Sequence, residues 1–178
     1  ETPEGTEIGL RKNLAILSKI STRTSMEEDK LLKICKESGL KKDIHEGNDI
    51  FLNGRFIGTV NENNEFIHSL KNKRRSAELP IELSIRFDKI FNNVLLSTEI
   101  GRVMRPLIIV ENGISKLTED HMKLLREGAL IWDDLVKNGI IEYLDAAEEE
   151  NALVALLPEQ ITENHTHLEI DKIDLLGL

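Results

Sequence analysis

The sequence contains few of the residues that most often build compact chemical sites. Only one of its 178 residues is a cysteine, Cys35, and aromatic side chains make up 4% of the chain. A single cysteine excludes an internal disulfide and every zinc motif that uses several cysteines. It is typical of a reducing compartment, of which the cytoplasm is the simplest example. Because its neighbours are apolar, we expect Cys35 to be an inert core thiol.

Long apolar runs and familiar catalytic motifs are also absent from the sequence. No run approaches the ~20 apolar residues that a membrane-spanning helix needs, and no secretory leader is visible. The sequence contains no phosphate-binding loop, nucleophile elbow or dinucleotide fingerprint. These absences give little support to an independent enzyme.

The chain has no overall excess of positive charge, since its formal net charge is -9 at pH 7. A free-standing DNA-binding module would normally be basic. The charge is uneven, however: Lys71, Lys73, Arg74 and Arg75 form a basic cluster, and the stretch "AAEEENA" is acidic. A mean charge can conceal a local patch, so nucleic-acid binding stays open for part of the surface.

The apolar pattern predicts an α+β protein, with antiparallel sheets flanked by short helices in two small subdomains that meet near Pro80. A Gly/Pro turn at the start leads to a short strand within residues 14–22. Ser25 and Glu28 have the spacing of a capping box, which predicts the start of a helix. Gly39 stands where that helix is expected to end.

The next part of the chain predicts a hairpin and a second helix. Asn53 and Gly54 lie between two β-favouring arms, which is typical of a two-residue turn with positive φ at both positions. Residues 61–79 then place Phe66 and Leu70 on one helical face, and Pro80 is expected to stop this helix.

The remaining residues predict further strands and two short helices. Residues 81–87 alternate in polarity, and residues 94–110 continue the sheet. Pro106 cannot donate to a ladder, so we expect its strand to lie at an edge or to bulge there. Thr118 is expected to cap a helix. Glycines are expected to end the two helices, at Gly128 and Gly139, and three short strands follow at 140–145, 151–158 and 165–171.

One group of residues has metal-ligand character. In "HTHLEID", the residues His165, His167 and Glu169 would point to one face of a strand. Such convergence is needed for a metal site, which also requires an enclosing pocket. We favour the simpler interpretation, a polar strand face.

The two charged clusters each have two interpretations. The acidic stretch "DAAEEEN" could hold a divalent cation or a basic partner, but a solvated turn is favoured. Lys73, Arg74 and Arg75 could contact phosphate, or could be solvated cations that stabilise the end of a helix. No aromatic residues are interleaved with these cations, which argues against stacking on single-stranded nucleic acid.

Several motifs in order along the chain carry a family resemblance. The opening "ETPEGTEIGLRKNLA" resembles a signature of the second-largest (β or B-type) subunit of multisubunit DNA-directed RNA polymerases. Four further segments resemble the same family: "RRSAELPIELSI", "STEIGRVMRPLIIVENG", "GIIEYLDAAEEENALVAL" and "HTHLEID". These segments extend over essentially the whole chain, and their wording is similar to archaeal and eukaryotic members.

The resemblance implies an arrangement of domains and a division of labour. The chain is expected to be a fragment, with residues 1–24 as the end of the fork region. Residues 25–80 and 81–178 are expected to form two external subdomains, the second leading toward the hybrid-binding region. In such polymerases magnesium is held by aspartates of the largest subunit. The resemblance therefore implies that this fragment has no catalytic or metal-binding residue and no cofactor of its own, and is inactive alone.

The resemblance also implies which residues lie near nucleic acid. The opening element lies close to the RNA end of the hybrid in the family, which suggests proximity for Pro3, Glu4, Ile8 and Asn13. Arg11 and Lys12 would be phosphate contacts. A carboxylate beside RNA is costly without a donor, so Glu4 is expected to position protein groups.

The expected partners are the largest subunit, the rest of the second-largest subunit, the DNA template and the RNA transcript, and no membrane. The expected location is the cytoplasm of a prokaryotic-type cell, or the nucleus of a eukaryote. An alternative is an interaction module that contacts polymerase subunits or transcription factors without touching nucleic acid.

Overall fold

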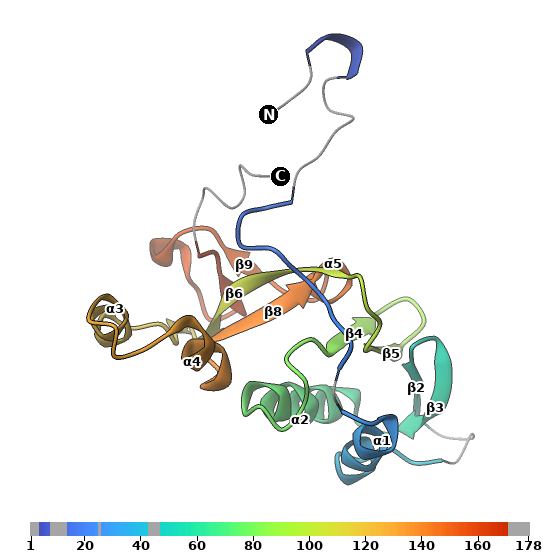
Figure 1. Ribbon diagram of the computed structural model, residues 1–178. Helices are drawn as coiled ribbons and strands as arrows, with labels where there is room; N and C mark the ends of the chain where they lie inside the picture. Colours follow the sequence, from blue (N-terminus) through green and yellow to red (C-terminus); the bar gives the residue numbers. More distant parts are fainter. Residues whose placement is uncertain (1–3, 8–13, 25, 43–46, 171–178) are drawn as a thin grey trace.

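A computed structural model describes residues 4–7, 14–24, 26–42 and 47–170 of the chain (Figure 1). Its described residues form two separate sheets with five short α-helices, and neither sheet closes into a barrel. The predicted α+β class is confirmed. None of the helices in the described part of the chain is both long and apolar enough to cross a bilayer.

The first sheet contains four strands in the order β3-β2-β5-β4. Their bounds are β2 Asn48–Leu52, β3 Arg55–Val60, β4 Ser84–Asp88 and β5 Asn93–Ser97. The pairings β2·β3 and β4·β5 are antiparallel, but β2 and β5 run parallel. The expectation of purely antiparallel sheets is therefore corrected here, since the chain passes through a helix before it returns to pair with β2.

Two helices pack on this sheet, α1 (Glu28–Glu37) and α2 (Asn63–Arg75). Leu31 and Cys35 of α1 and Phe66 and Leu70 of α2 are buried in one core with the apolar residues of the strands. Burial raises the pKa of the Cys35 thiol to about 11, so the sulfur stays protonated at neutral pH. Cys35 therefore lies in the core, as expected for an inert thiol.

The ends of these helices differ in part from the predicted ones. Helix α1 has Glu27 as its N-cap residue, without a side-chain cap bond, whereas Ser25 lies outside the described residues. Gly39 follows the helix with a φ of 112°, as predicted for a glycine at this position. Helix α2 ends at Arg75, well before Pro80, because Ala77 adopts a left-handed φ of 60°.

The second sheet is built around β6 (Val103–Glu111). One side of β6 pairs with β8 (Ile141–Asp145), and its other side pairs with β1 (Lys19–Ile20) and β10 (His167–Leu168). The short strand β7 (Ile114–Ser115) pairs antiparallel with β6. The short strand β9 (Val154–Ala155) pairs parallel with β10.

Pro106 is located within this central strand rather than at a sheet edge. It pairs with Tyr143 of β8, while on the other side of β6 the pairing with β1 stops at Met104 and that with β10 starts at Ile108. The N–H of Ile109 donates toward β8, and backbone N–H groups alternate in direction along a strand. The Pro106 nitrogen therefore faces the gap between β1 and β10, where the ladder needs no donor.

Helices α3 (Glu119–Arg126) and α4 (Trp132–Lys137) lie between β7 and β8 in the chain, and α5 (Ala146–Glu149) lies between β8 and β9. Two 3-10 turns, Gly5–Glu7 and Pro158–Gln160, complete the described elements. Thr118 caps α3, as predicted, and the structure adds a reciprocal bond from the Thr118 N–H to the His121 side chain. Leu135 and Val136 of α4 pack with Ile108 and Ile141 in a second core.

The boundary between the two sheets lies after Ser97, where the chain leaves β5 and enters β6 (Figure 1). Pro80 does not coincide with this boundary, because residues 84–97 complete the first sheet. Helix α2 belongs to the first core, and its C-terminal end is directed toward β8 and α5 of the second sheet.

Candidate functional site

The residues predicted to lie near nucleic acid are mostly outside the described part of the chain. Pro3, Ile8, Arg11, Lys12 and Asn13 are in ranges 1–3 and 8–13, which the structure does not describe. Glu4 is described and exposed, immediately before a short 3-10 turn. The proximity of these residues to nucleic acid stays a prediction.

The basic cluster of Lys73, Arg74 and Arg75 was expected either to contact phosphate or to be solvated. The structure shows a different environment for Arg74. Arg74 is in the last turn of α2, yet its side chain is only 2% exposed. Its guanidinium donates to both carboxylate oxygens of Glu148, at 2.7 Å each, and to Glu142 at 2.8 Å. It also donates to the Leu83 carbonyl at 2.5 Å. Arg74 is therefore neither placed to contact phosphate nor solvated, which corrects both expectations for this residue.

Its neighbours in the cluster are also bound to carboxylates. Arg75 donates to Glu142 at 2.6 Å and to Glu111 at 3.1 Å. Lys73 lies 3.8 Å from Glu37, a longer and more exposed ion pair. The phosphate contacts proposed for Arg75 and Lys73 would compete with these internal partners.

Glu142 is the centre of this network. It is 4% exposed. Its Oε2 accepts from Arg74 at 2.8 Å, and its Oε1 binds both Arg75, at 2.6 Å, and His167 Nε2, at 2.8 Å. Burial alone would raise the pKa of Glu142, but Arg74, His167 and Arg75 stabilise the charged form and hold this pKa well below its usual range. Burial lowers the pKa of Arg74, and Glu148 and Glu142 more than offset this, so its pKa is raised.

We call residues 142–150 the acidic segment; it comprises β8 from its second residue, α5 and Glu150. Every carboxylate in this segment has an arginine partner. The pairs not yet described are Asp145 with Arg102 at 2.5 Å, Glu149 with Arg105 at 2.5 Å and Glu150 with Arg86 at 2.7 Å. The expected solvated turn is therefore wrong for most of this segment, since Glu150 is the only one of its carboxylates that is mainly exposed.

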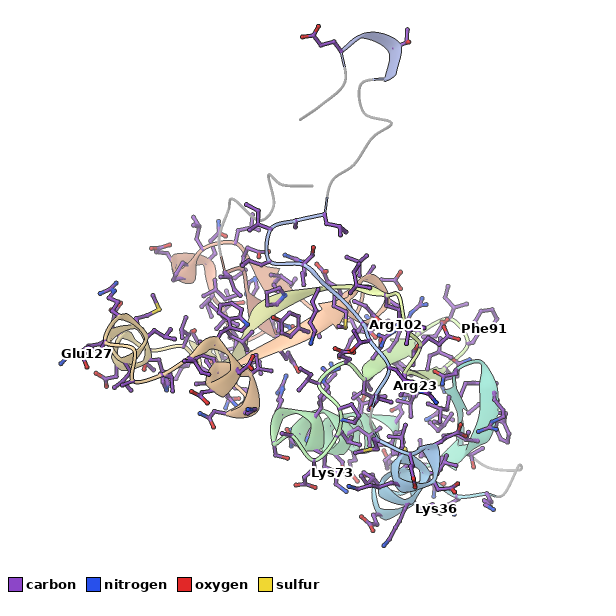
Figure 2. All side chains as sticks on the ribbon, in the orientation of Figure 1. Arg23, Lys36, Lys73, Phe91, Arg102 and Glu127 are labelled. Carbon is purple, nitrogen blue, oxygen red and sulfur yellow. The ribbon has the colours of Figure 1, made fainter. Side chains whose placement is uncertain are left out.

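Asp145 combines three roles in this segment. Its Oδ1 accepts from the Glu148 N–H at 2.9 Å and so caps α5, and it accepts from Ser84 Oγ of the first sheet at 3.0 Å. Its Oδ2 binds Arg102, which is labelled in Figure 2 and lies between the two sheets along the chain. Burial would raise the pKa of Asp145, but the Glu148 N–H, Arg102 and Ser84 lower it overall.

The residues of the expected polar strand face do not converge. Strand β10 contains only His167 and Leu168, so His165 precedes it and binds Thr162 through Nδ1. His167 binds Glu142, and Glu169 binds Arg105. Across the described ranges, no group of three or more His, Cys, Asp or Glu side chains could hold a metal ion.

This arrangement connects the two sheets. Arg74 and Arg75 come from α2, which packs on the first sheet, and Arg86 comes from β4 of that sheet. Their carboxylate partners are Glu142 of β8, Glu148 of α5 and Glu150, which directly follows α5. An arginine bound by two carboxylate oxygens in a fixed plane gives geometric specificity as well as energy. These ion pairs therefore hold one sheet against the other. Sequence reasoning missed this because these paired residues are 64 to 74 positions apart.

Comparison with known protein families supports the resemblance of the sequence motifs. Residues 50–111 match a family model described as RNA polymerase Rpb2, domain 4, and residues 132–172 match one described as RNA polymerase Rpb2, domain 5. Together these two models match more than half of the chain.

Two relatives illustrate the similarity. DNA-directed RNA polymerase subunit Rpo2 of Sulfolobus acidocaldarius is 37% identical over all of this chain and 17% of its own length. DNA-directed RNA polymerase III subunit RPC2 of Schizosaccharomyces pombe is 36% identical over 99% of this chain and 16% of its own length. The chain therefore spans about a sixth of the length of these relatives. It belongs to the Rpb2 family of second-largest RNA polymerase subunits, of which it is a fragment that includes domains 4 and 5.

Proposed function

We propose that this chain is a non-catalytic part of a DNA-directed RNA polymerase, which supports template-directed RNA synthesis by shaping the surroundings of the active centre and the outer face of the second-largest subunit. The names of its relatives support a role in transcription. In this proposal the fragment makes no RNA alone, and magnesium is bound by the largest subunit of the assembled enzyme.

The observation that carries the proposal is the pairing of the acidic segment with arginines. A carboxylate cluster that served as a metal site would keep its oxygens directed into a common open position. Here Glu142 and Glu148 are nearly fully buried and bound by Arg74, so their oxygens hold protein elements together. Such a segment is suited to bracing a larger assembly.

The partners in this proposal are the largest subunit, the rest of the second-largest subunit, the DNA template and the RNA transcript. The residues that would lie near RNA are Pro3, Glu4, Ile8 and Asn13. The polymerase would act in the cytoplasm of a prokaryotic-type cell or in a nucleus. These placements follow from the family resemblance of the opening motif.

Arg11→Ala and Lys12→Ala in the complete polymerase test the nucleic-acid contact. A cation on a phosphate forms a charge-assisted hydrogen bond worth about 1.5–3 kcal/mol. We therefore expect transcript release from stalled complexes at raised salt to be at least ~10-fold faster in each variant. Lys123→Ala, an exposed cation on α3, is the matched control. Release at the wild-type rate in both variants would contradict the contact.

The second candidate is an interaction module that makes no nucleic-acid contact. It is favoured by one observation: Arg74 and Arg75, two of the predicted phosphate contacts, are bound internally. If the Arg11 and Lys12 variants release transcript normally but assemble poorly with the other subunits, this second function is the correct one.

A further inference from the structure

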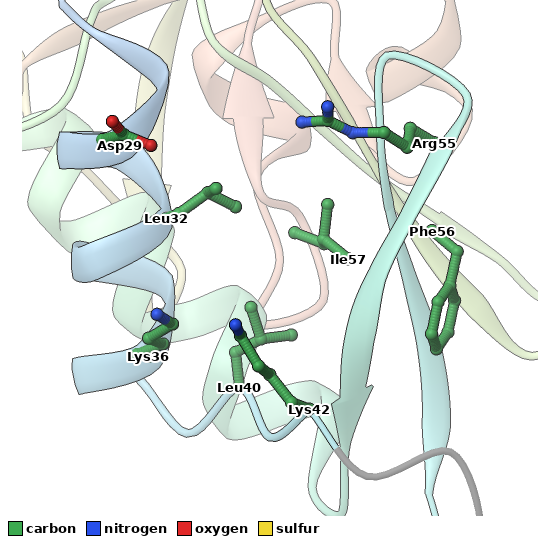
Figure 3. Close-up of a pocket in the computed structure, with 8 residues that line it drawn as sticks. All are labelled: Asp29, Leu32, Lys36, Leu40, Lys42, Arg55, Phe56 and Ile57. Carbon is green, nitrogen blue, oxygen red and sulfur yellow. The ribbon is translucent and has the colours of Figure 1, made fainter.

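A groove lies between α1 and the edge of the first sheet, far along the chain from the acidic segment. It has a volume of about 510 Å³. Figure 3 shows Leu32 of α1 and Ile57 of β3 facing each other across it, with Leu40 at its base. Leu32 and Ile57 are only partly buried, so the groove presents an aliphatic floor to solvent.

The rim of this groove is basic, although the chain as a whole has a net charge of -9. It carries Lys36, Lys42 and Arg55 against a single carboxylate, that of Asp29. Arg55 is paired with Glu28. Lys36 and Lys42 are exposed and form no ion pair with any other residue that the structure describes. Two cations are thus available for an anionic partner.

Strand β3 supplies the third feature of the groove. It is at the end of its sheet, and its outer side carries one bridge, in which Thr59 and Lys41 exchange hydrogen bonds of 2.8 and 2.9 Å. Within the described ranges, no strand lies outside residues 55–57. An unpaired edge is a template for an added strand.

We propose that this groove binds an extended acidic segment of a partner protein, which adds as a strand to the outer edge of β3. Its carboxylates would contact Lys36 and Lys42, and an apolar side chain would fill the space between Leu32 and Ile57. Added strands gain affinity from main-chain hydrogen bonds and specificity from alternate side chains. The proposal does not depend on the nucleic-acid contacts of the opening motif.

The lining of the groove favours a peptide over a nucleic acid. Single-stranded nucleic acid is usually held by bases stacked on aromatic rings. Phe56 is among the residues that line the groove, but Figure 3 shows its ring directed away from Leu32, and it packs edge-on against Phe51 with the ring centroids 5.8 Å apart. The floor offered to a ligand is aliphatic, which suits the side chain of a peptide.

The test measures binding of a fluorescent peptide, in which Glu alternates with Val, to the 178-residue chain. Binding is monitored by the fluorescence anisotropy of the peptide. We expect saturable binding that weakens at high salt, and K36E/K42E should weaken it by at least ~10-fold. K123E/K137E makes the same charge change at two exposed positions outside the groove and should bind like wild type. Equal binding by wild type and K36E/K42E, or no saturable binding, would overturn the proposal.

Two further probes test the strand pairing and the class of ligand. A peptide methylated on alternate backbone nitrogens cannot pair with β3 and should bind at least ~10-fold more weakly. Unchanged affinity would refute the added strand. A thymidine oligonucleotide of the same length should bind more weakly than the Glu–Val peptide. If it binds more tightly and K36E/K42E abolishes its binding, the groove is a nucleic-acid surface and the proposal is wrong.

Discussion

At the scale of single residues, Arg74 illustrates how a buried charge becomes acceptable. Removing a guanidinium from water costs several kcal/mol, and one ion pair rarely offsets it. Arg74 makes charged hydrogen bonds to both oxygens of Glu148 and to one of Glu142, and a further bond to a carbonyl. Its Nε is buried without a partner in the described structure, so the network is not complete. Its fit therefore depends on both carboxylates staying ionised.

Acid should weaken this network, since the pKa values of Glu142 and Asp145 are lowered in the folded chain. Their stabilisation is present above the ordinary values of 4.5 and 3.8, and it is lost as the pH falls through the lower folded values. We expect the free energy of unfolding, measured with urea from pH 7 to 3, to fall below about pH 4.5. D145N should make this decline shallower.

Asp133→Asn is the matched control for that substitution. Asp133 is exposed on α4, so removing its carboxyl should leave the pH dependence as in the wild type. Equal slopes for D145N and wild type would contradict the assignment of Asp145 as a stabilising, ionised residue.

At the scale of elements, the tight turns are the best-predicted features. Asn53 and Gly54 have φ values of 49° and 77°, and Asn112 and Gly113 have 53° and 74°. Asn53 and Gly54 form the expected turn, and Asn112 and Gly113 form one of the same kind, because only Asn, Asp and Gly adopt such φ values readily. Short strands were less predictable. Strand β1 has two residues where a longer strand was expected, since its length depends on where a distant strand offers a partner.

Two glycines of the first hairpin should respond differently to substitution. Gly54 has a positive φ but open space around it, so G54A should cost only the backbone strain of about 1–2 kcal/mol. At Gly58, an added Cβ would lie 2.2 Å from the Lys41 carbonyl oxygen, which belongs to the bridge with Thr59. We expect G58A to destabilise the chain more than G54A in urea unfolding. Equal costs would show that the Lys41 segment is not packed on β3 in solution.

At the scale of the whole molecule, the α+β class and most elements could be predicted, but the joining of the sheets could not. The class follows from local apolar patterns. The joint depends on pairs such as Arg74 with Glu148, which are 74 positions apart and share no local pattern. For the same reason the boundary was expected at Pro80, a local signal, whereas residues 84–97 complete the first sheet by pairing with β2.

Two of the strongly exposed apolar residues lie next to each other at the turn between β4 and β5. Ile90 and Phe91 are 87% and 76% exposed at the tip of the β4–β5 turn, and Figure 2 shows Phe91 at the periphery of the molecule. Asp88 accepts hydrogen bonds from both of their backbone N–H groups, so the tip is held in one shape. Large exposed apolar side chains are typical of contact surfaces.

A double-mutant cycle between Arg74 and Glu148 tests the central claim most directly, with R74M, E148Q and the double variant measured by urea unfolding. The buried pair should show a coupling energy of about 1.5–3 kcal/mol, because its members contact each other without solvent. The matched pair Arg86–Glu150, whose carboxylate side chain is 61% exposed, should couple by less than about 0.5 kcal/mol. No coupling at Arg74–Glu148, or equal coupling in the two pairs, would contradict the account that this network holds the two sheets together.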